Sequence, residues 1–146
     1  MHIVSRGVRH SIPRRWLIRA AEAAMRAIGA RPDAELEVAL TDDATVARIN
    51  RTFLGHRGPT DVLTFPGDER SGERVMGEIV ISVERARVQA RRAGWPVRQE
   101  AALLLVHGVL HLGGFDDRSA RAAARMRRME RLVLQRAFGE DWSRAP

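Results

Sequence analysis

Two histidines, His107 and His111, lie four residues apart in a strongly apolar stretch of the chain. On a helix, residues at positions i and i+4 share a face, so both imidazoles would leave that face one turn apart. A histidine on an apolar helix is more often a satisfied core residue than a ligand, but two unpaired imidazoles in so apolar a helix would be costly. The spacing therefore predicts that both histidines bind one metal ion, with imidazole nitrogen as the donor.

A third ligand is expected directly after this pair. Gly113 and Gly114 turn the chain back, which brings Asp116 and Asp117 within reach of the same point. A carboxylate oxygen is an ordinary zinc ligand, and Asp117 is the best candidate. Asp116 is a candidate catalytic carboxylate, or equally a partner that orients an imidazole. We therefore expect one Zn²⁺ per chain, with one coordination position left open for water or substrate.

The residue after the first histidine limits the kind of hydrolase. In H-E-x-x-H peptidases this residue is a glutamate that acts as general base, whereas here it is Gly108. A small zinc peptidase or amidase remains an alternative, but this route is disfavoured. The proton acceptor must then be a metal-bound hydroxide, a nearby carboxylate or a phosphate of the substrate itself.

Apolar periodicity and turn residues predict the elements that position these side chains. We expect strand-forming segments at Ile3–Val4, Glu35–Leu40, Thr60–Phe65 and Gly77–Ser82, and helices at Pro13–Ile28, Asp43 to about Phe53, Ser82–Arg92, Val97–Leu112 and Arg118–Phe138. In the second helix Val46, Ile49 and Phe53 should face inward. The pattern indicates a single domain of the α+β or mixed α/β class over residues 1–146, with the helix at 97–112 packed on the sheet.

Composition and charge point toward an anionic partner. The chain of 146 residues has no cysteine, which excludes disulfides and thiolate chemistry, and it has a formal net charge of +7 with arginine as its only basic residue besides histidine. Such an excess favours nucleic acid first. Arginines recur at 118, 121, 125 and 128 and crowd positions 85, 87, 91 and 92. We expect some of them to contact RNA, although a charged stripe is usually just solvated.

With no apolar run long enough for a membrane span, we expect a soluble intracellular protein.

The run from His107 to Asp117, HGVLHLGGFDD, resembles the signature of the YbeY family of bacterial endoribonucleases, H-G-x-L-H-L-x-G-[YF]-D-H, at ten of eleven positions. Two earlier segments are similar to family motifs in the same order. The segment PTDVLTFP at 59–66 resembles P-T-[DN]-V-L-S-F-P, and GEIVIS at 77–82 resembles G-D-I-x-I-S. The likeness covers roughly residues 36–139.

This resemblance implies a single-strand-specific, zinc-dependent endoribonuclease of the cytoplasm that acts in 16S rRNA 3′-end maturation and ribosome quality control. Its partners would be single-stranded RNA or rRNA and the small ribosomal subunit, with a ribosomal protein or a ribosome-assembly GTPase as further candidates, and no membrane. It also implies an α+β fold, with a small four-stranded mixed sheet flanked by about five helices. The signature positions that hold zinc correspond to His107, His111 and Asp117.

The chain departs from the family pattern at two positions. The third ligand position is usually histidine, and here it is Asp117, so the charge of the site falls and its metal preference could shift toward manganese. Leu54 stands where the family commonly has an arginine that is thought to serve the active site. Arg57, or else Arg51, is the candidate replacement for binding phosphate, unless both are simply solvated. These departures keep open a zinc-binding, ribosome-associated RNA-binding protein with little catalysis.

Overall fold

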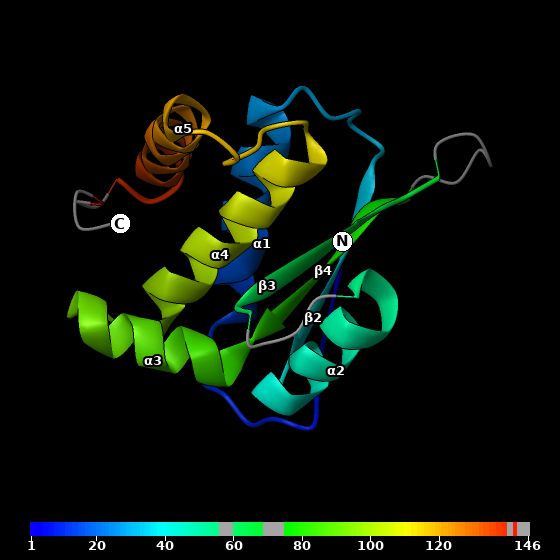
Figure 1. The fold of residues 1–146 in the computed structure, drawn as a ribbon. Helices are drawn as coiled ribbons and strands as arrows, with labels where there is room; N and C mark the ends of the chain where they lie inside the picture. Colours follow the sequence, from blue (N-terminus) through cyan, green and yellow to red (C-terminus); the bar gives the residue numbers. More distant parts are fainter. Residues whose placement is uncertain (56–59, 69–74, 140–141, 143–146) are drawn as a thin grey trace.

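The computed structural model describes residues 1–55, 60–68, 75–139 and 142, and these form four strands and five helices. The elements are β1 His2–Arg6, α1 Arg14–Ala27, β2 Glu35–Thr41, α2 Asp43–Leu54, β3 Val62–Pro66, β4 Val75–Ser82, α3 Val83–Ala93, α4 Val97–Leu112 and α5 Ala120–Phe138. The fold is a single α+β domain, which confirms the predicted class (Figure 1). Among the described helices, none is both long enough and apolar enough to cross a membrane.

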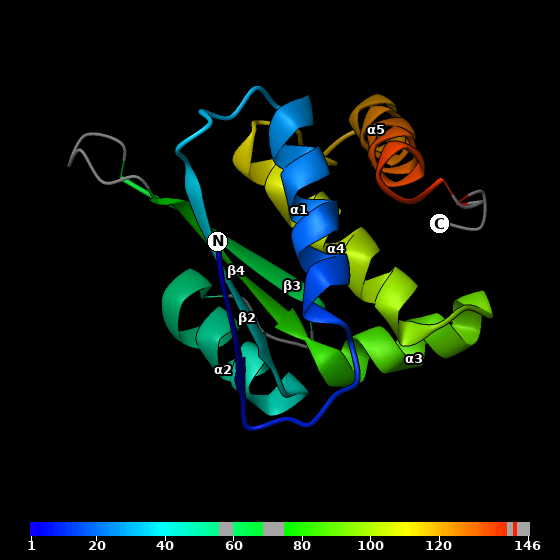
Figure 2. The ribbon, with the colours of Figure 1, turned by 180° about the vertical axis from the view of Figure 1, so that it is seen from behind.

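The four strands form one mixed sheet in the order β1-β2-β4-β3. Strand β1 is parallel to β2, and β2 is parallel to β4, whereas β3 pairs with β4 in antiparallel register. Parallel neighbours need crossover connections. Helix α1 provides the crossover from β1 to β2, and α2 and β3 lie between β2 and β4. Seen from the two opposite sides, α1 and α4 lie on one face of the sheet and α2 lies on the other (Figures 1 and 2).

From Ile79 to Ile81, strand β4 is buried on both faces because helices cover both sides of the sheet. Ile79 and Ile81 point into the main core, which they share with residues of α1, α4 and α5. Val80 points the opposite way and packs with Val46 of α2 and Leu63 of β3 in a smaller cluster. The near-continuous apolar run of β4 is the pattern that such a doubly covered strand requires.

Helix α4 is the central element, and its bounds agree with those predicted from the sequence. It packs so closely on the sheet that a Cβ atom at Gly108 would lie 3.0 Å from Ile79 Cδ1 and 3.2 Å from Thr64 Cγ2. Successive residues on a helix are separated by about 100°. His107 and His111 therefore leave α4 to one side of its contact with the sheet, and both side chains are half-buried.

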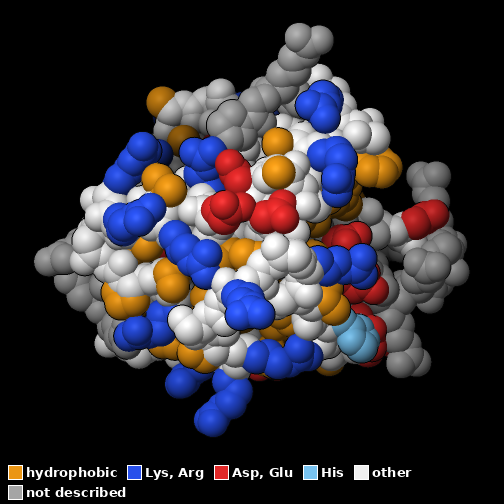
Figure 3. Space-filling model, turned by 90° about the horizontal axis from the view of Figure 1, so that it is seen from below, with side chains coloured by type: hydrophobic (Ala, Val, Ile, Leu, Met, Phe, Trp, Pro, Cys, Tyr) orange, Lys and Arg blue, Asp and Glu red, His pale blue; other side chains and the backbone are white. Residues whose placement is uncertain are grey.

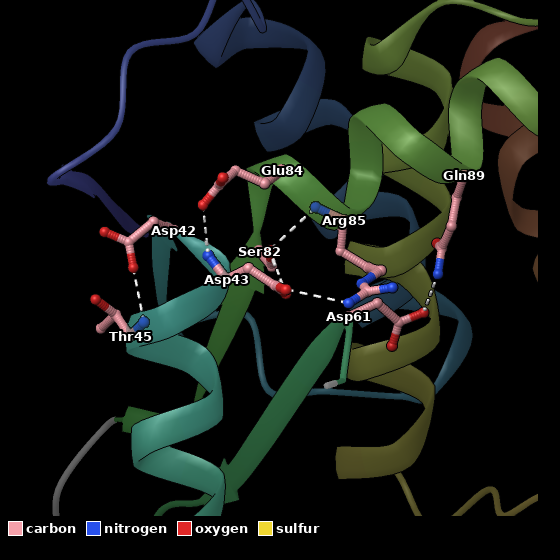
Figure 4. A network of polar contacts seen from close by, with 8 residues as sticks. All are labelled: Asp42, Asp43, Thr45, Asp61, Ser82, Glu84, Arg85 and Gln89. Carbon is pink, nitrogen blue, oxygen red and sulfur yellow. Dashed lines mark hydrogen bonds and ion pairs between the residues drawn. The ribbon is translucent and has the colours of Figure 1, made fainter. Parts of the chain in front are cut away.

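A polar network fixes the starts of α2 and α3 (Figure 4). Asp42 caps α2 by accepting a hydrogen bond from the Thr45 amide at 2.7 Å. Ser82 caps α3 by accepting from the Arg85 amide at 3.1 Å. The Arg85 guanidinium pairs with the Asp43 carboxylate at 3.0 Å, so the two helix starts are joined. Each cap satisfies a backbone amide in the first turn of its helix, and the ion pair fixes the two starts relative to each other.

One inward-facing residue was predicted wrongly. Phe53 is 71% exposed, although Val46, seven residues earlier on the same helix, is buried. By its last turn α2 has reached the edge strand β3, where the Phe53 ring meets Phe65 edge-on at 6.5 Å between centroids. The sheet no longer provides a covering surface there, so helical periodicity alone could not place this side chain.

Candidate metal centre

The structure brings His107, His111 and Asp117 together. One ligand atom from each lies within 4.8 Å of the other two. The Nε2 atoms of His107 and His111 are 3.0 Å apart, and Asp117 Oδ2 lies 4.0 Å from His107 Nε2. In a tetrahedral zinc site with bonds of about 2.0–2.1 Å, ligand atoms are separated by about 3.3 Å. The three side chains are therefore spaced to hold one divalent ion with little movement.

The turn after α4 returns Asp117 to the histidines. Gly113 caps the helix, and Gly114 adopts φ +97°, a left-handed conformation that a residue with a Cβ atom rarely adopts. The Phe115 amide donates a hydrogen bond to Leu110 O at 3.0 Å, which fixes the reversal of the chain. The double glycine thus does what the sequence predicted of it.

His107 is also held on the side away from the common point. His107 Nδ1 lies 2.6 Å from Glu130 Oε1 of α5. A metal-binding histidine usually has such a partner for its second nitrogen, because this partner fixes the tautomer and the ring orientation. His107 Nε2 is consequently left facing the Nε2 atom of His111.

Sequence reasoning missed Glu130 as part of the site. Glu130 is only 5% exposed and lies on the buried face of α5 with Met126 and Val133. A carboxylate on an otherwise apolar helical stripe was the signal that could have found it, since a buried charge needs a partner. Its pairing with His107, 23 residues earlier, depends on how α5 packs against α4 and could not be read from spacing.

The two histidines have pKa values shifted in opposite directions. Burial lowers the pKa of His107, but the hydrogen bond and negative charge of Glu130, with Asp117 and Asp61, outweigh this effect and raise it above 6.5. Burial and the neighbouring His107 lower the pKa of His111 below 6.5. Without a metal, protonated His107 can donate a hydrogen bond from Nε2 to Nε2 of neutral His111, which lies 3.0 Å away.

The remaining predicted residues are not placed at the ligand cluster. Asp116 is exposed, and its Oδ1 accepts a hydrogen bond from the Arg118 amide at 3.0 Å. Arg57 lies outside the described residues. Leu54, where the family pattern has arginine, ends α2 and is 42% exposed, and Arg51 on the same helix is exposed. Glu130, and not Asp116, is the carboxylate that contacts an imidazole. It binds His107 Nδ1, on the side away from the ligand cluster.

Exposed arginines surround much of the molecule. On the segment containing α5, the side chains at 118, 121, 125 and 128 are all exposed, as the spacing predicted. The Arg125 guanidinium lies 5.0 Å from the centre of the Phe115 ring, in cation–π geometry. Arg85 differs, because it is half-buried and paired with Asp43. The face shown in Figure 3 carries many basic side chains, with acidic ones gathered in a few places.

The donor set fits a divalent transition metal. Two imidazole nitrogens and one carboxylate oxygen form the same type of set as the two histidines and one glutamate of several zinc hydrolases. Related sets with open positions also hold iron(II). The carboxylate partner of His107 strengthens the fit, because it occupies Nδ1 and leaves Nε2 facing the Nε2 atom of His111 at 3.0 Å.

Comparisons with known proteins identify the family to which the chain is similar. The family model described as Endoribonuclease YbeY matches residues 5–137. The Endoribonuclease YbeY of Geobacter sulfurreducens is 40% identical over 133 residues, covering 88% of this chain and 87% of the relative. That of Aquifex aeolicus is 38% identical over 118 residues, covering 80% and 78%. That of Persephonella marina is 46% identical over 93 residues, and this match covers 61% of either protein.

A solved structure shows the same fold. The solution structure of a Thermotoga maritima protein superposes with a TM-score of 0.62 and covers 94% of this chain and 89% of that one, at 24% sequence identity. At that identity the likeness concerns the fold alone. Together, the family model over nearly the whole chain and the relatives near 40% identity show that this chain belongs to the YbeY family.

Proposed function

We propose that this protein is a zinc-dependent, single-strand-specific endoribonuclease of the cytoplasm, acting in 16S rRNA 3′-end maturation and ribosome quality control. Membership of the YbeY family supports nuclease activity, since the matching relatives are named endoribonucleases. The observation that carries the metal dependence is the convergence of His107, His111 and Asp117 within 4.8 Å. The net charge of +7 supports RNA as the substrate.

Each residue of the site has a defined task in this proposal. His107, His111 and Asp117 would hold the metal, and Glu130 orients His107 through the 2.6 Å contact. A zinc ion held there would supply Lewis acidity toward a phosphate oxygen or a water molecule. Three protein ligands leave room for that oxygen.

The reaction itself is the hydrolysis of a phosphodiester bond. A water oxygen bonds to phosphorus, one phosphorus–oxygen ester bond breaks, and the leaving ribose oxygen gains a proton. The water must lose a proton to an acceptor, and a phosphate oxygen of the substrate can take it, because the structure does not place Asp116, the carboxylate predicted from the sequence, at the ligand cluster. Arg57 would bind the phosphate in place of the arginine that Leu54 replaces.

The proposed partners follow from the substrate. The protein would meet single-stranded rRNA on the small ribosomal subunit, and a ribosomal protein or a ribosome-assembly GTPase would present that RNA. Exposed arginines on α5 offer guanidinium groups that match phosphate oxygens and stack on unpaired bases.

Cleavage of single-stranded RNA by purified protein tests the proposal. We expect zinc-loaded wild type to cleave, His111→Ala to lose activity, and His2→Ala to retain it, because His2 lies on β1 with a side chain that is 70% exposed. A chelator should abolish cleavage, and zinc should restore it. Equal cleavage by wild type and His111→Ala would instead reveal a contaminating nuclease.

A second candidate function is RNA binding with little catalysis. It is favoured by Asp117 at a position that is usually histidine and by Leu54 at a position that is usually arginine. RNA retained by wild type without cleavage, at any metal loading, would support this candidate and contradict the nuclease. Peptide cleavage with intact RNA would support the peptidase alternative.

A further inference from the structure

A cavity of about 670 Å³ adjoins the candidate metal centre and is lined in part by His107, Asp117 and Glu130. Its volume lies within the range of about 300–1,000 Å³ that is usual for small-molecule sites. The cavity extends away from the ligand cluster along α4, from His107 back to Glu100. Seven residues of helix correspond to about 10 Å, a distance that one nucleotide spans from its phosphate to the far edge of its base.

The walls of this cavity combine apolar and polar surface. Ala93 of α3 and Ala123 of α5 are half-buried and offer apolar surface to the face of a flat ring, whereas Leu103, Leu104 and Met126 behind them are almost wholly buried. Arg92 of α3 and Arg127 of α5 also line it, and both are exposed. An unpaired base needs an apolar surface against its faces, and its phosphate needs cations.

Four carboxylates line the cavity, and the two that lie away from the ligand cluster are held in place by hydrogen bonds. Glu100 is 3% exposed, and its Oε2 accepts a hydrogen bond from Trp95 Nε1 at 2.8 Å. Asp61, directly before β3, accepts a hydrogen bond from Gln89 Nε2 of α3 at 3.1 Å, and the two side chains point toward one another (Figure 4). Residues far apart in sequence thus present two carboxylates to one cavity.

Carboxylates select among nucleobases by the donors that each base offers. The Watson–Crick edge of guanine presents two adjacent donors, N1–H and the N2 amino group, which one carboxylate can accept together. Uracil presents one N–H group between two carbonyl oxygens, which a carboxylate repels. A carboxylate-lined cavity therefore favours guanine and disfavours uracil.

We infer that this cavity binds one unpaired nucleotide of the RNA next to the cleaved bond and that it prefers guanine, with Glu100 as the residue that determines the preference. The base contacts the apolar wall, and Arg92 and Arg127 bind the phosphate groups. This inference rests on the proposed endoribonuclease function for the identity of the RNA, but the binding of a nucleotide can be measured separately.

Calorimetric titration of the full-length chain, supplied with zinc, with 5′-GMP and with 5′-UMP tests the inference. Neither probe has a phosphodiester bond to cleave, and their phosphates are the same, so a difference in affinity reports the base. We expect GMP to bind about tenfold more tightly than UMP, the size of effect that one paired hydrogen-bonding contact provides. Glu100→Gln should remove the preference, and the matched control Glu22→Gln, on the exposed side of α1, should retain it.

Three outcomes of the nucleotide titrations would overturn the inference. These are equal affinities for the two nucleotides, no binding of either, or a guanine preference that survives Glu100→Gln. Binding of a second zinc ion that Glu100→Gln removes would also overturn it, because the cavity would then be a metal site. A protein that cleaves RNA without binding GMP selectively would refute the inference alone, and one that binds GMP selectively but leaves RNA intact would refute the proposed function alone.

Discussion

At the scale of single residues, the candidate metal centre includes a carboxylate, Glu130, that contacts one of the proposed ligands and is not itself among them. Glu130 is buried and lies 2.6 Å from His107 Nδ1, so its negative charge favours a ring that donates from Nδ1 and binds a metal through Nε2. The exposed Asp117 offers a third candidate ligand atom from a turn. The candidate ligand set therefore combines two half-buried histidines on α4 with an exposed carboxylate in the turn that follows.

Glu130→Gln tests this role. The glutamine oxygen can still accept a hydrogen bond from His107, so we expect the fold to remain, while loss of the negative charge lowers zinc affinity by about 10–100-fold. Competition with a chromophoric chelator measures the affinity, and Glu22→Gln provides the control. Unchanged zinc affinity in Glu130→Gln would show that the 2.6 Å contact has no influence on the metal.

Glu100→Gln should make the protein more stable at neutral pH. Burial raises the pKa of Glu100 above its ordinary value of 4.5, and the charges of Asp61 and Glu130 add to this effect, although the hydrogen bond from Trp95 opposes it. The ionised carboxylate is therefore less favourable in the folded state than in the unfolded chain. This penalty is absent below pH 4.5 and develops as the pH rises through the raised pKa.

Urea unfolding of wild type and Glu100→Gln across pH measures this effect. Glutamine keeps an acceptor for Trp95, so the variant should have the larger free energy of unfolding at pH 7, and the two proteins should converge toward pH 4. A variant that is less stable than wild type at pH 7 would mean that the ionised carboxylate has a compensating partner.

At the scale of elements, the site depends on how helix α4 lies on the sheet. Its extent was predictable because an apolar run lies between Pro96 and the double glycine at 113–114. The meeting of His107, His111 and Asp117 was predictable for the same reason, since helical spacing and a tight turn are local features. The contact with Glu130 and the cavity that includes Asp61 and Gln89 were not, because they depend on packing between distant segments.

Gly77→Ala probes this packing. A Cβ atom at Gly77 of β4 would lie 2.8 Å from Leu112 Cδ1 and 2.9 Å from the carbonyl oxygen of Phe65, so α4 or β3 must shift. We expect a loss of about 1–3 kcal/mol in the free energy of unfolding, as for other overpacked sites. Because Leu112 follows His111, zinc affinity should fall as well.

Denaturant titration measures the loss for Gly77→Ala, and Glu78→Ala, at the exposed neighbouring position on the same strand, is the matched control. The control should change stability by less than about 0.5 kcal/mol. A Gly77→Ala protein as stable as wild type would show that α4 can move away from the sheet at little cost.

At the scale of the whole molecule, the excess of arginine distinguishes this chain. The net charge is +7, and many of the arginines that produce it are exposed to solvent, as those along α5 illustrate. An excess of positive charge attracts RNA whatever its sequence, because the contacts are with phosphate groups. The sequence showed this excess directly, but it could not show that Arg85 is taken up by an ion pair with Asp43.

The salt dependence of RNA binding tests the part played by α5. Arg121 and Arg128 are exposed and seven residues apart, so they lie on one face of that helix. Replacing both with glutamine should weaken binding of single-stranded RNA and reduce the slope of log Kd against log salt by about 1.4, since each phosphate contact contributes about 0.7. Filter binding over a range of salt concentrations measures the slope.

The matched control replaces Arg15 and Arg26, two exposed arginines on α1. Their loss should leave the slope nearly unchanged. Equal reductions in both double variants would mean that RNA responds to net charge and does not bind at α5 in particular.

The most direct test of the metal centre is a crystal grown with zinc, with diffraction recorded on both sides of the zinc absorption edge. The account predicts one anomalous peak per chain, about 2.0–2.2 Å from the Nε2 atoms of His107 and His111 and from an Asp117 carboxylate oxygen. The peak should disappear in Asp117→Ala crystals or weaken strongly. A zinc ion bound elsewhere, or imidazoles that point apart with no peak between them, would contradict the account.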